Sequence, residues 1–99
     1  MEIEKPKVRK FTTIGSGKAD IYVVVVPKEA KVVGMTVRDI TSSNFPSQCI
    51  FIAVYNKENE AFSIPRGDQI ISEEDHLYLI SNAEYIKQAT DFLTATKSG

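Results

Sequence analysis

The run DIYVVVVP at residues 20–27 constrains the fold of this chain more than any other stretch. Its β-branched and aromatic residues favour a strand, and Pro27 ends it because proline cannot donate a hydrogen bond to a sheet. A strand with one face in water would alternate between apolar and polar residues, whereas this run is apolar without interruption. The sequence therefore predicts a strand that is covered on both faces.

Three later segments predict further strands. CIFIAVYN at residues 49–56 is the second strand, and AFSIP at residues 61–65 is a shorter third strand that its proline ends. HLYLIS at residues 76–81 alternates in and out as a last strand. The polar segments TSSNFPSQ, KENE and SEED between these runs are typical of loops and turns.

Two helices are expected, each with a capping signal at its start. Val33, Val37 and Ile40 have the spacing of one helix face, and Thr36 with Asp39 resembles a capping box, so a short helix should begin at Thr36. Ser81 with Glu84 predicts the start of a final helix in the same way. The apolar face of that helix is Ile86, Ala89 and Leu93, flanked by Tyr85 and Phe92.

These elements predict a single compact α+β domain, ordered strand, helix, strand, strand, strand, helix, with a mostly antiparallel sheet. Ninety-nine residues are enough for one hydrophobic core. Alternation within the strands selects these core residues: Ile21, Val23, Val25, Val37, Ile40, Ile50, Ile52, Val54, Leu77, Leu79, Ile86 and Leu93.

The first 18 residues differ from the rest, because they are charged, hold Pro6 and end on Gly-Ser-Gly. We expect residues 1–18 to be a linker or arm, with at most a short strand at Phe11 to Ile14, and the domain to occupy residues 19–95.

The segment PRGD at residues 65–68 has the residue types of a tight turn. Pro65 sets φ near −65°, Gly67 would supply a positive φ, and Asp68 can bond the backbone that follows it. Turn chemistry thus accounts for this segment without a catalytic role.

Charge and cysteine content exclude several classes of protein. Twelve basic residues against 13 acidic ones give a net charge of −1, so the basic footprint of a nucleic-acid binder is absent. The lone Cys49 lies in an apolar run and is expected to be a buried thiol in a reducing compartment. No leader peptide or apolar run of ~20 residues is present, so we expect a cytosolic, soluble chain.

No catalytic, metal or cofactor site can be assembled from the sequence. GSGK at residues 15–18 lacks two requirements of a phosphate-binding loop, since Thr12 and Ala19 replace the glycine before and the hydroxyl residue after. His76 is the only histidine and has no cysteine nearby, which argues against zinc sites and nucleophilic triads. The carboxylates at residues 73–75 point in alternate directions and are expected to form a solvated turn. The chain is therefore not expected to be an enzyme.

From about Ala19 to Leu93 the chain resembles the TrkA C-terminal domain family, also called the RCK C-terminal domain, which regulates potassium channels and transporters. The resemblance rests on IYVVVVP, on VVGMTVRDI as a Gly-x-x-hydrophobic-x-x-hydrophobic helix entry, on CIFIAVYNKENEAFSIPRGD with its Pro-x-Gly-Asp, and on ISEEDHLYLIS. In the last, Asp75 would fix the turn before the final strand. Such domains usually follow a nucleotide-binding domain, whose G-x-G-x-x-G fingerprint is absent here, so a fragment or a stand-alone copy is expected.

The resemblance implies a cytoplasmic regulatory module at the periphery of a membrane transport complex. Its partners would be a second copy of itself, a membrane-embedded potassium channel or transporter subunit, and a small effector such as cyclic di-AMP. The homodimer interface would involve residues 37–45, with the effector at that interface. Because the family module also occurs on other ion transporters, the transported ion stays open.

The candidate ligand-binding residues follow from that implied site. Ile40 and Phe45 would cover purine faces, and Asn44 would read a base edge. Ser42 and Ser43 would donate hydrogen bonds to phosphates, and Arg38 or Arg66 would supply positive charge. The alternative is a purely structural dimerisation module with no ligand.

Overall fold

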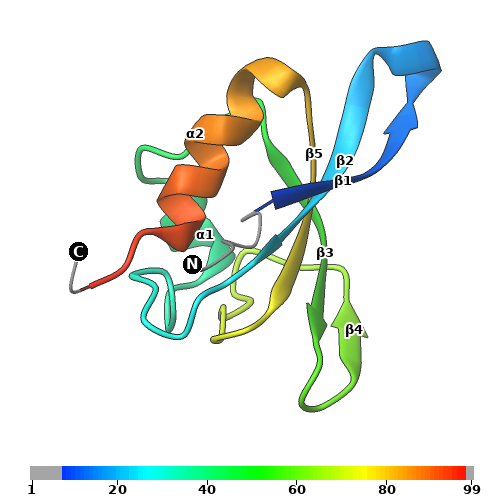
Figure 1. Ribbon diagram of the computed structural model, residues 1–99. Coiled ribbons are helices and arrows are strands. Elements are labelled where there is room, and N and C mark those ends of the chain that lie inside the picture. Colours follow the sequence, from blue (N-terminus) through cyan, green and yellow to red (C-terminus); the bar gives the residue numbers. More distant parts are fainter. Residues whose placement is uncertain (1–7, 98–99) are drawn as a thin grey trace, which may run out of the picture.

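A five-stranded antiparallel sheet, with strand order β1-β2-β5-β3-β4, forms the centre of the computed structural model, which describes residues 8–97 (Figure 1). Two α-helices and a short 3-10 turn complete it. In chain order the elements are β1 (Val8–Ile14), η1 (Gly15–Gly17), β2 (Ala19–Val25), α1 (Val37–Thr41), β3 (Ile50–Asn56), β4 (Ala61–Ser63), β5 (His76–Ser81) and α2 (Ala83–Thr94). The predicted α+β class and the predicted order of elements from β2 onward are confirmed.

The N-terminal strand β1 is longer than the sequence suggested. It runs from Val8 to Ile14 and pairs with β2 along its length, with one irregularity between Lys10 and Thr12. The turn between the two strands uses three positive φ angles, of 61° at Gly15, 54° at Ser16 and 90° at Gly17. The expected short strand at Phe11 to Ile14 is thus part of a hairpin, because the glycines allow the chain to reverse tightly. Residues 1–7 of the predicted arm lie outside the described residues.

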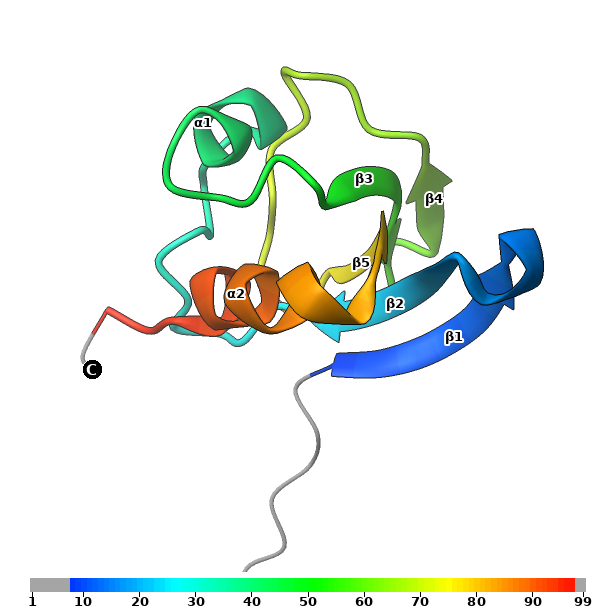
Figure 2. The same ribbon diagram turned by 90° about the horizontal axis from the view of Figure 1, so that it is seen from above.

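Both helices lie on one side of the sheet, and the outer strands β1 and β4 lie toward the other side (Figure 2). The core is on the helical side, where Leu77 and Leu79 of β5 and Leu93 of α2 are fully buried. The predicted apolar face of α2 is confirmed, since Ile86, Ala89 and Leu93 are all buried. The buried side chains of β2 and β5 therefore pack with the apolar face of α2 in one core.

Part of the predicted core list is wrong. In β2, Val23 is buried as predicted, with 5% of its surface exposed, but Val25 on the same face is 39% exposed, and the side chains toward the helices are Tyr22 and Val24. In β3, Ile50 is 53% exposed, and Ile52 is half-buried at an irregularity between Phe51 and Ala53. A run that is apolar on both faces has no polar residue to mark its outer side, and a bulge shifts the alternation that follows it.

Local capping signals were accurate to within one residue. The capping box of α1 is present: the Asp39 amide donates to Thr36 Oγ1 at 3.1 Å, and the Thr36 amide donates to Asp39 Oδ2 at 3.4 Å. At α2 the cap is Asn82 rather than Ser81, since the Glu84 amide donates to Asn82 Oδ1 at 3.1 Å. Ser81 is instead a buried residue at the end of β5.

Cys49 is buried as predicted, with 2% of its surface exposed, and its thiol donates to Ser81 Oγ at 3.1 Å. Burial raises the pKa of the Cys49 thiol, which lowers the thiolate fraction at neutral pH.

We expect a disulfide reagent to label Cys49 at least ~100-fold more slowly in the native protein than in concentrated urea. Equal labelling rates by absorbance would contradict this placement of the thiol.

Candidate functional site

A loop that follows β4 is hydrogen-bonded to the segment before α1 and to the first turn of α1. The Gly34 amide donates to the Ile71 carbonyl at 2.8 Å, and the Ile71 amide donates to the Met35 carbonyl at 2.9 Å. The Arg38 amide then donates to the Gly67 carbonyl at 2.9 Å. Because these bonds join two segments distant in sequence, they bring both candidate arginines, Arg38 and Arg66, to one region of the surface.

Gly67 lies against the side chain of Arg38 and does not have a positive φ angle. Its φ is outside the positive region that the sequence predicted, because the positive-φ glycines among residues 8–97 are Gly15, Gly17 and Gly34. A Cβ atom at Gly67 would lie 2.8 Å from Nη2 of Arg38, so the guanidinium lies directly over this glycine. The PRGD turn therefore supports the side chain of Arg38, while Arg66 is exposed in the same turn.

The polar candidates Ser42, Ser43 and Asn44 directly follow α1 and are exposed. The Ser43 hydroxyl donates to the Asp39 carbonyl at 2.8 Å, and the Asn44 carbonyl accepts from Gln88 Nε2 of α2 at 3.4 Å. These bonds fix the loop against both helices while the Asn44 side chain keeps its amide for other partners. We call the exposed set Arg38, Ser42, Ser43, Asn44 and Arg66 the α1 surface.

The two apolar candidates point inward. Ile40 has no exposed surface, and Phe45 has 6%. The Phe45 ring stacks on Phe51 of β3 at 5.4 Å between centroids and meets Phe92 of α2 edge-on at 5.7 Å. Both side chains therefore belong to the core of the single chain, and neither presents a face to a purine there. The ligand site itself stays a prediction.

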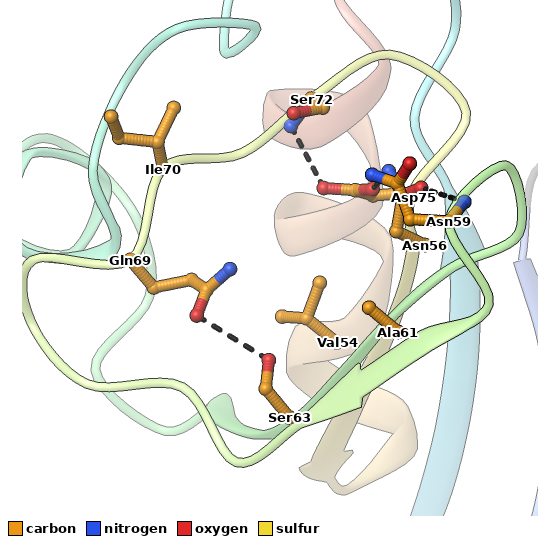
Figure 3. Close-up of a pocket in the computed structure, with 9 residues that line it drawn as sticks. All are labelled: Val54, Asn56, Asn59, Ala61, Ser63, Gln69, Ile70, Ser72 and Asp75. Carbon is orange, nitrogen blue, oxygen red and sulfur yellow. Dashed lines mark hydrogen bonds between the residues drawn. The ribbon is translucent and has the colours of Figure 1, made fainter.

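A separate pocket of about 180 Å³ lies beneath β4 and the loop of residues 69–72 (Figure 3). Its lining is mostly polar and includes Asn56, Ser63, Gln69, Ser72 and Asp75. These groups bond one another, as where Ser63 Oγ donates to Gln69 Oε1 at 3.3 Å. No residue of the α1 surface lines this pocket. Sequence reasoning missed it because its walls come from β3, β4 and the loop before β5, which meet only in the folded chain.

Asp75 is the buried centre of that polar cluster. Only 2% of it is exposed, and its carboxylate accepts from the Ser72 amide at 2.8 Å and from Asn56 Nδ2 at 2.7 Å. Its carbonyl accepts from the Val26 amide at 2.9 Å, which joins the end of β2 to the start of β5. The predicted role of Asp75 in fixing the turn is confirmed. The prediction that all three carboxylates are solvated holds for Glu73 and Glu74 but is wrong for Asp75.

Within residues 8–97, no group of three or more histidine, cysteine, aspartate or glutamate side chains is placed to hold a metal ion. In the same range no helix has the length and apolar character needed to cross a bilayer.

Comparisons with known proteins agree with this architecture. The sequence model of the TrkA-C domain family matches residues 21–94, which include α1, the PRGD turn and Asp75. A solved structure titled "Structure of RCK domain with cda" has the same fold, with 20% sequence identity and a TM-score of 0.52. That match covers 72% of this chain and 96% of the other. TrkA-C domains are generally regulatory domains of potassium transport systems. The chain belongs to the TrkA-C domain family.

Proposed function

We propose that this chain is a cytoplasmic regulatory domain that docks on a potassium channel or transporter and acts by binding rather than by catalysis. The family match over residues 21–94 carries this proposal. The domain would be regulated by a small phosphate-bearing effector such as cyclic di-AMP, which would bind at the α1 surface. The similar RCK domain was solved with a component that its title calls cda, which supports a ligand-binding role.

The α1 surface has the chemistry that phosphates require. Arginines donate charge-assisted, bidentate hydrogen bonds to phosphate oxygens, and serine hydroxyls add further donors. Arg38 and Arg66 are exposed, and the Arg38 guanidinium lies over Gly67 in the turn that carries Arg66.

The same surface lacks an exposed apolar side chain for the bases, because Ile40 and Phe45 lie in the core. One copy would therefore bind such an effector mainly through phosphates and base edges. A second copy of the chain would complete the site, because the family resemblance implies a homodimer whose interface involves residues 37–45. Because the exposed residues of this surface are polar, we expect this contact between copies to form only with ligand present.

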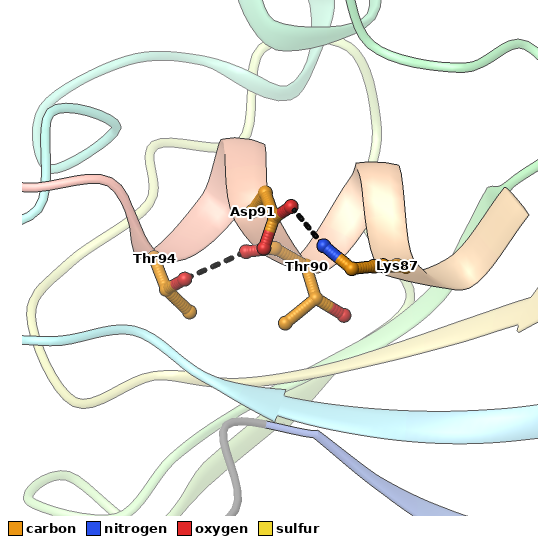
Figure 4. Close-up of polar contacts among 4 residues, drawn as sticks. All are labelled: Lys87, Thr90, Asp91 and Thr94. Atoms are coloured by element: carbon orange, nitrogen blue, oxygen red, sulfur yellow. Dashed lines mark hydrogen bonds and ion pairs between the residues drawn. The ribbon is translucent and has the colours of Figure 1, made fainter.

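Isothermal titration of the full chain with cyclic di-AMP tests this function. We expect binding for the wild type and an affinity loss of about tenfold or more for Arg38→Ala and for Arg66→Ala, since a hydrogen bond to a charged group contributes ~1.5–3 kcal/mol. The matched control is Lys87→Ala on α2, whose exposed ion pair with Asp91 spans 3.0 Å (Figure 4). An exposed pair of this kind contributes little to stability, so the control should bind like the wild type.

Absence of heat from the wild type up to millimolar nucleotide would contradict effector binding. The chain would then be a purely structural dimerisation module within the transport assembly.

A further inference from the structure

The pocket beneath β4 and the loop of residues 69–72 contains a buried carboxylate with unused acceptor positions (Figure 3). Asp75 lines this pocket although only 2% of the residue is exposed. Each carboxylate oxygen accepts one hydrogen bond, Oδ1 from Asn56 Nδ2 and Oδ2 from the Ser72 amide. An ionised carboxylate has about four acceptor positions, so Asp75 can accept further hydrogen bonds from a molecule in the pocket.

No positive charge of the described chain pairs with Asp75. Within residues 8–97 no lysine or arginine forms an ion pair with it, and the ion pair in that range joins Lys87 to Asp91 on α2. Both donors to Asp75 are neutral amides. Aspartate is almost never this buried without a paired cation, because a carboxylate loses much of its hydration on burial. A positively charged ligand would supply the missing partner.

The sequence around the pocket has an excess of negative charge. Residues 56–75 hold six carboxylates against two basic residues. Two of these carboxylates, Glu73 and Glu74, are exposed directly before Asp75. Charges of one sign around a concave site raise the local concentration of oppositely charged ligands. The pocket therefore favours cations and disfavours phosphates, unlike the α1 surface.

The size and the walls of the pocket define the rest of the ligand. Its volume of about 180 Å³ is below the ~300–1,000 Å³ of sites for drug-sized ligands, so the ligand has only a few heavy atoms. Val54 and Ala61 form an apolar wall that a carbon chain can contact (Figure 3). Gln69 accepts from Ser63 through its side-chain oxygen, which leaves its amide nitrogen available to donate. A bare ion can neither cover an apolar wall nor accept a hydrogen bond, whereas a short carbon chain with a hydroxyl group can do both.

We propose that this pocket binds a small amino alcohol, in which a primary ammonium is joined by a short carbon chain to a hydroxyl group. The ammonium donates hydrogen bonds to the Asp75 carboxylate, the carbon chain contacts the apolar wall, and the hydroxyl oxygen accepts from Gln69. The site is separate from the α1 surface and selects the opposite charge, so the proposal does not rest on effector binding. Because the Asp75 carbonyl holds the Val26 amide at the junction of β2 and β5, a ligand bound here stabilises the folded chain.

An NMR titration of the full chain at pH 7 with ethanolamine hydrochloride tests this site. Ethanolamine is protonated at this pH and is very small, so we expect a dissociation constant on the order of 1 mM. The side-chain amide signals of Asn56 and Gln69 should shift and reach saturation. Ethylene glycol has nearly the same size but no charge, and it should produce no saturable shift. Potassium chloride at the same concentration should produce none either, and it controls for ionic strength.

Two variants test whether the ligand lies in the pocket. Asp75→Asn removes the charge with little change in shape and should weaken binding at least ~10-fold, since hydrogen bonds to charged groups are the stronger ones. Ile70→Lys puts a competing ammonium at the rim of the pocket, where Ile70 is 57% exposed, and should weaken binding similarly even if Asp75→Asn does not fold. The matched control is Ile64→Lys, which adds the same charge at a position that is 78% exposed and does not line the pocket. This control should bind ethanolamine like the wild type.

Four results would overturn the proposal. The first is the absence of saturable shifts in the wild type up to ~100 mM ethanolamine. The second is an equal response to ethylene glycol, which would show that the charge is not recognised. The third is an equal and saturable response to potassium chloride, which would assign the pocket to a bare cation. The fourth is a folded Ile70→Lys protein that binds ethanolamine like the wild type, which would place the ligand elsewhere.

Discussion

Leu79→Asp is expected to leave the chain without a cooperative unfolding transition at 25 °C. Leu79 has no exposed surface and lies between its strand partners Tyr22 of β2 and Phe51 of β3. The substitution removes the packing of a buried leucine, which contributes ~2–5 kcal/mol, and places an unpaired carboxylate in the core. A domain of this size has a total stability of ~5–15 kcal/mol, so the combined loss should unfold it. Urea titration by circular dichroism measures the effect.

The comparison variant is Ile52→Asp. Ile52 is half-buried at the irregularity in β3, so the carboxylate of an aspartate at this position can reach water after a small adjustment. It should remain folded with reduced stability. The sequence alone had placed Ile52 in the core. If Ile52→Asp lost its cooperative unfolding transition as Leu79→Asp is expected to, that placement would be correct. If the free energy of unfolding of Leu79→Asp lay within ~1 kcal/mol of the wild-type value, the burial of Leu79 in β5 would be contradicted.

Asp75→Ala should lower the free energy of unfolding by about 3–4 kcal/mol. The carboxylate accepts from Asn56 Nδ2 at 2.7 Å and from the Ser72 amide at 2.8 Å, and hydrogen bonds to a charged group contribute ~1.5–3 kcal/mol each. Without the carboxylate, these two donors lose their partner beside the junction of β2 and β5. Chemical denaturation at pH 7 measures the loss.

The matched control for Asp75 is the neighbouring carboxylate Glu73, which is exposed. Glu73→Ala should change stability by no more than ~0.5 kcal/mol. Asn56→Ala should be less harmful in the Asp75→Ala background than in the wild type, because the two residues share one hydrogen bond. Additive losses in this double-mutant cycle would show that the Asn56–Asp75 bond contributes little.

Local chemistry allowed the sequence to predict much of the fold. The Thr36–Asp39 capping box and the apolar face of α2 depend on residues within a few positions of one another, and both are confirmed. The order of elements from β2 onward followed from runs of apolar residues separated by turn-forming segments. The family resemblance rested on the same local motifs, and the match to TrkA-C domains confirms it.

Only the tertiary structure decided which side of each element is buried. The β2 run is apolar on both faces, so nothing within it determines which side the helices cover; the chain's path over the sheet does. The same packing draws Ile40 and Phe45 into the core, seats Arg38 over Gly67 and buries Asp75 between turns. Each of these contacts joins segments far apart in sequence, and local periodicity carries no information about such neighbours.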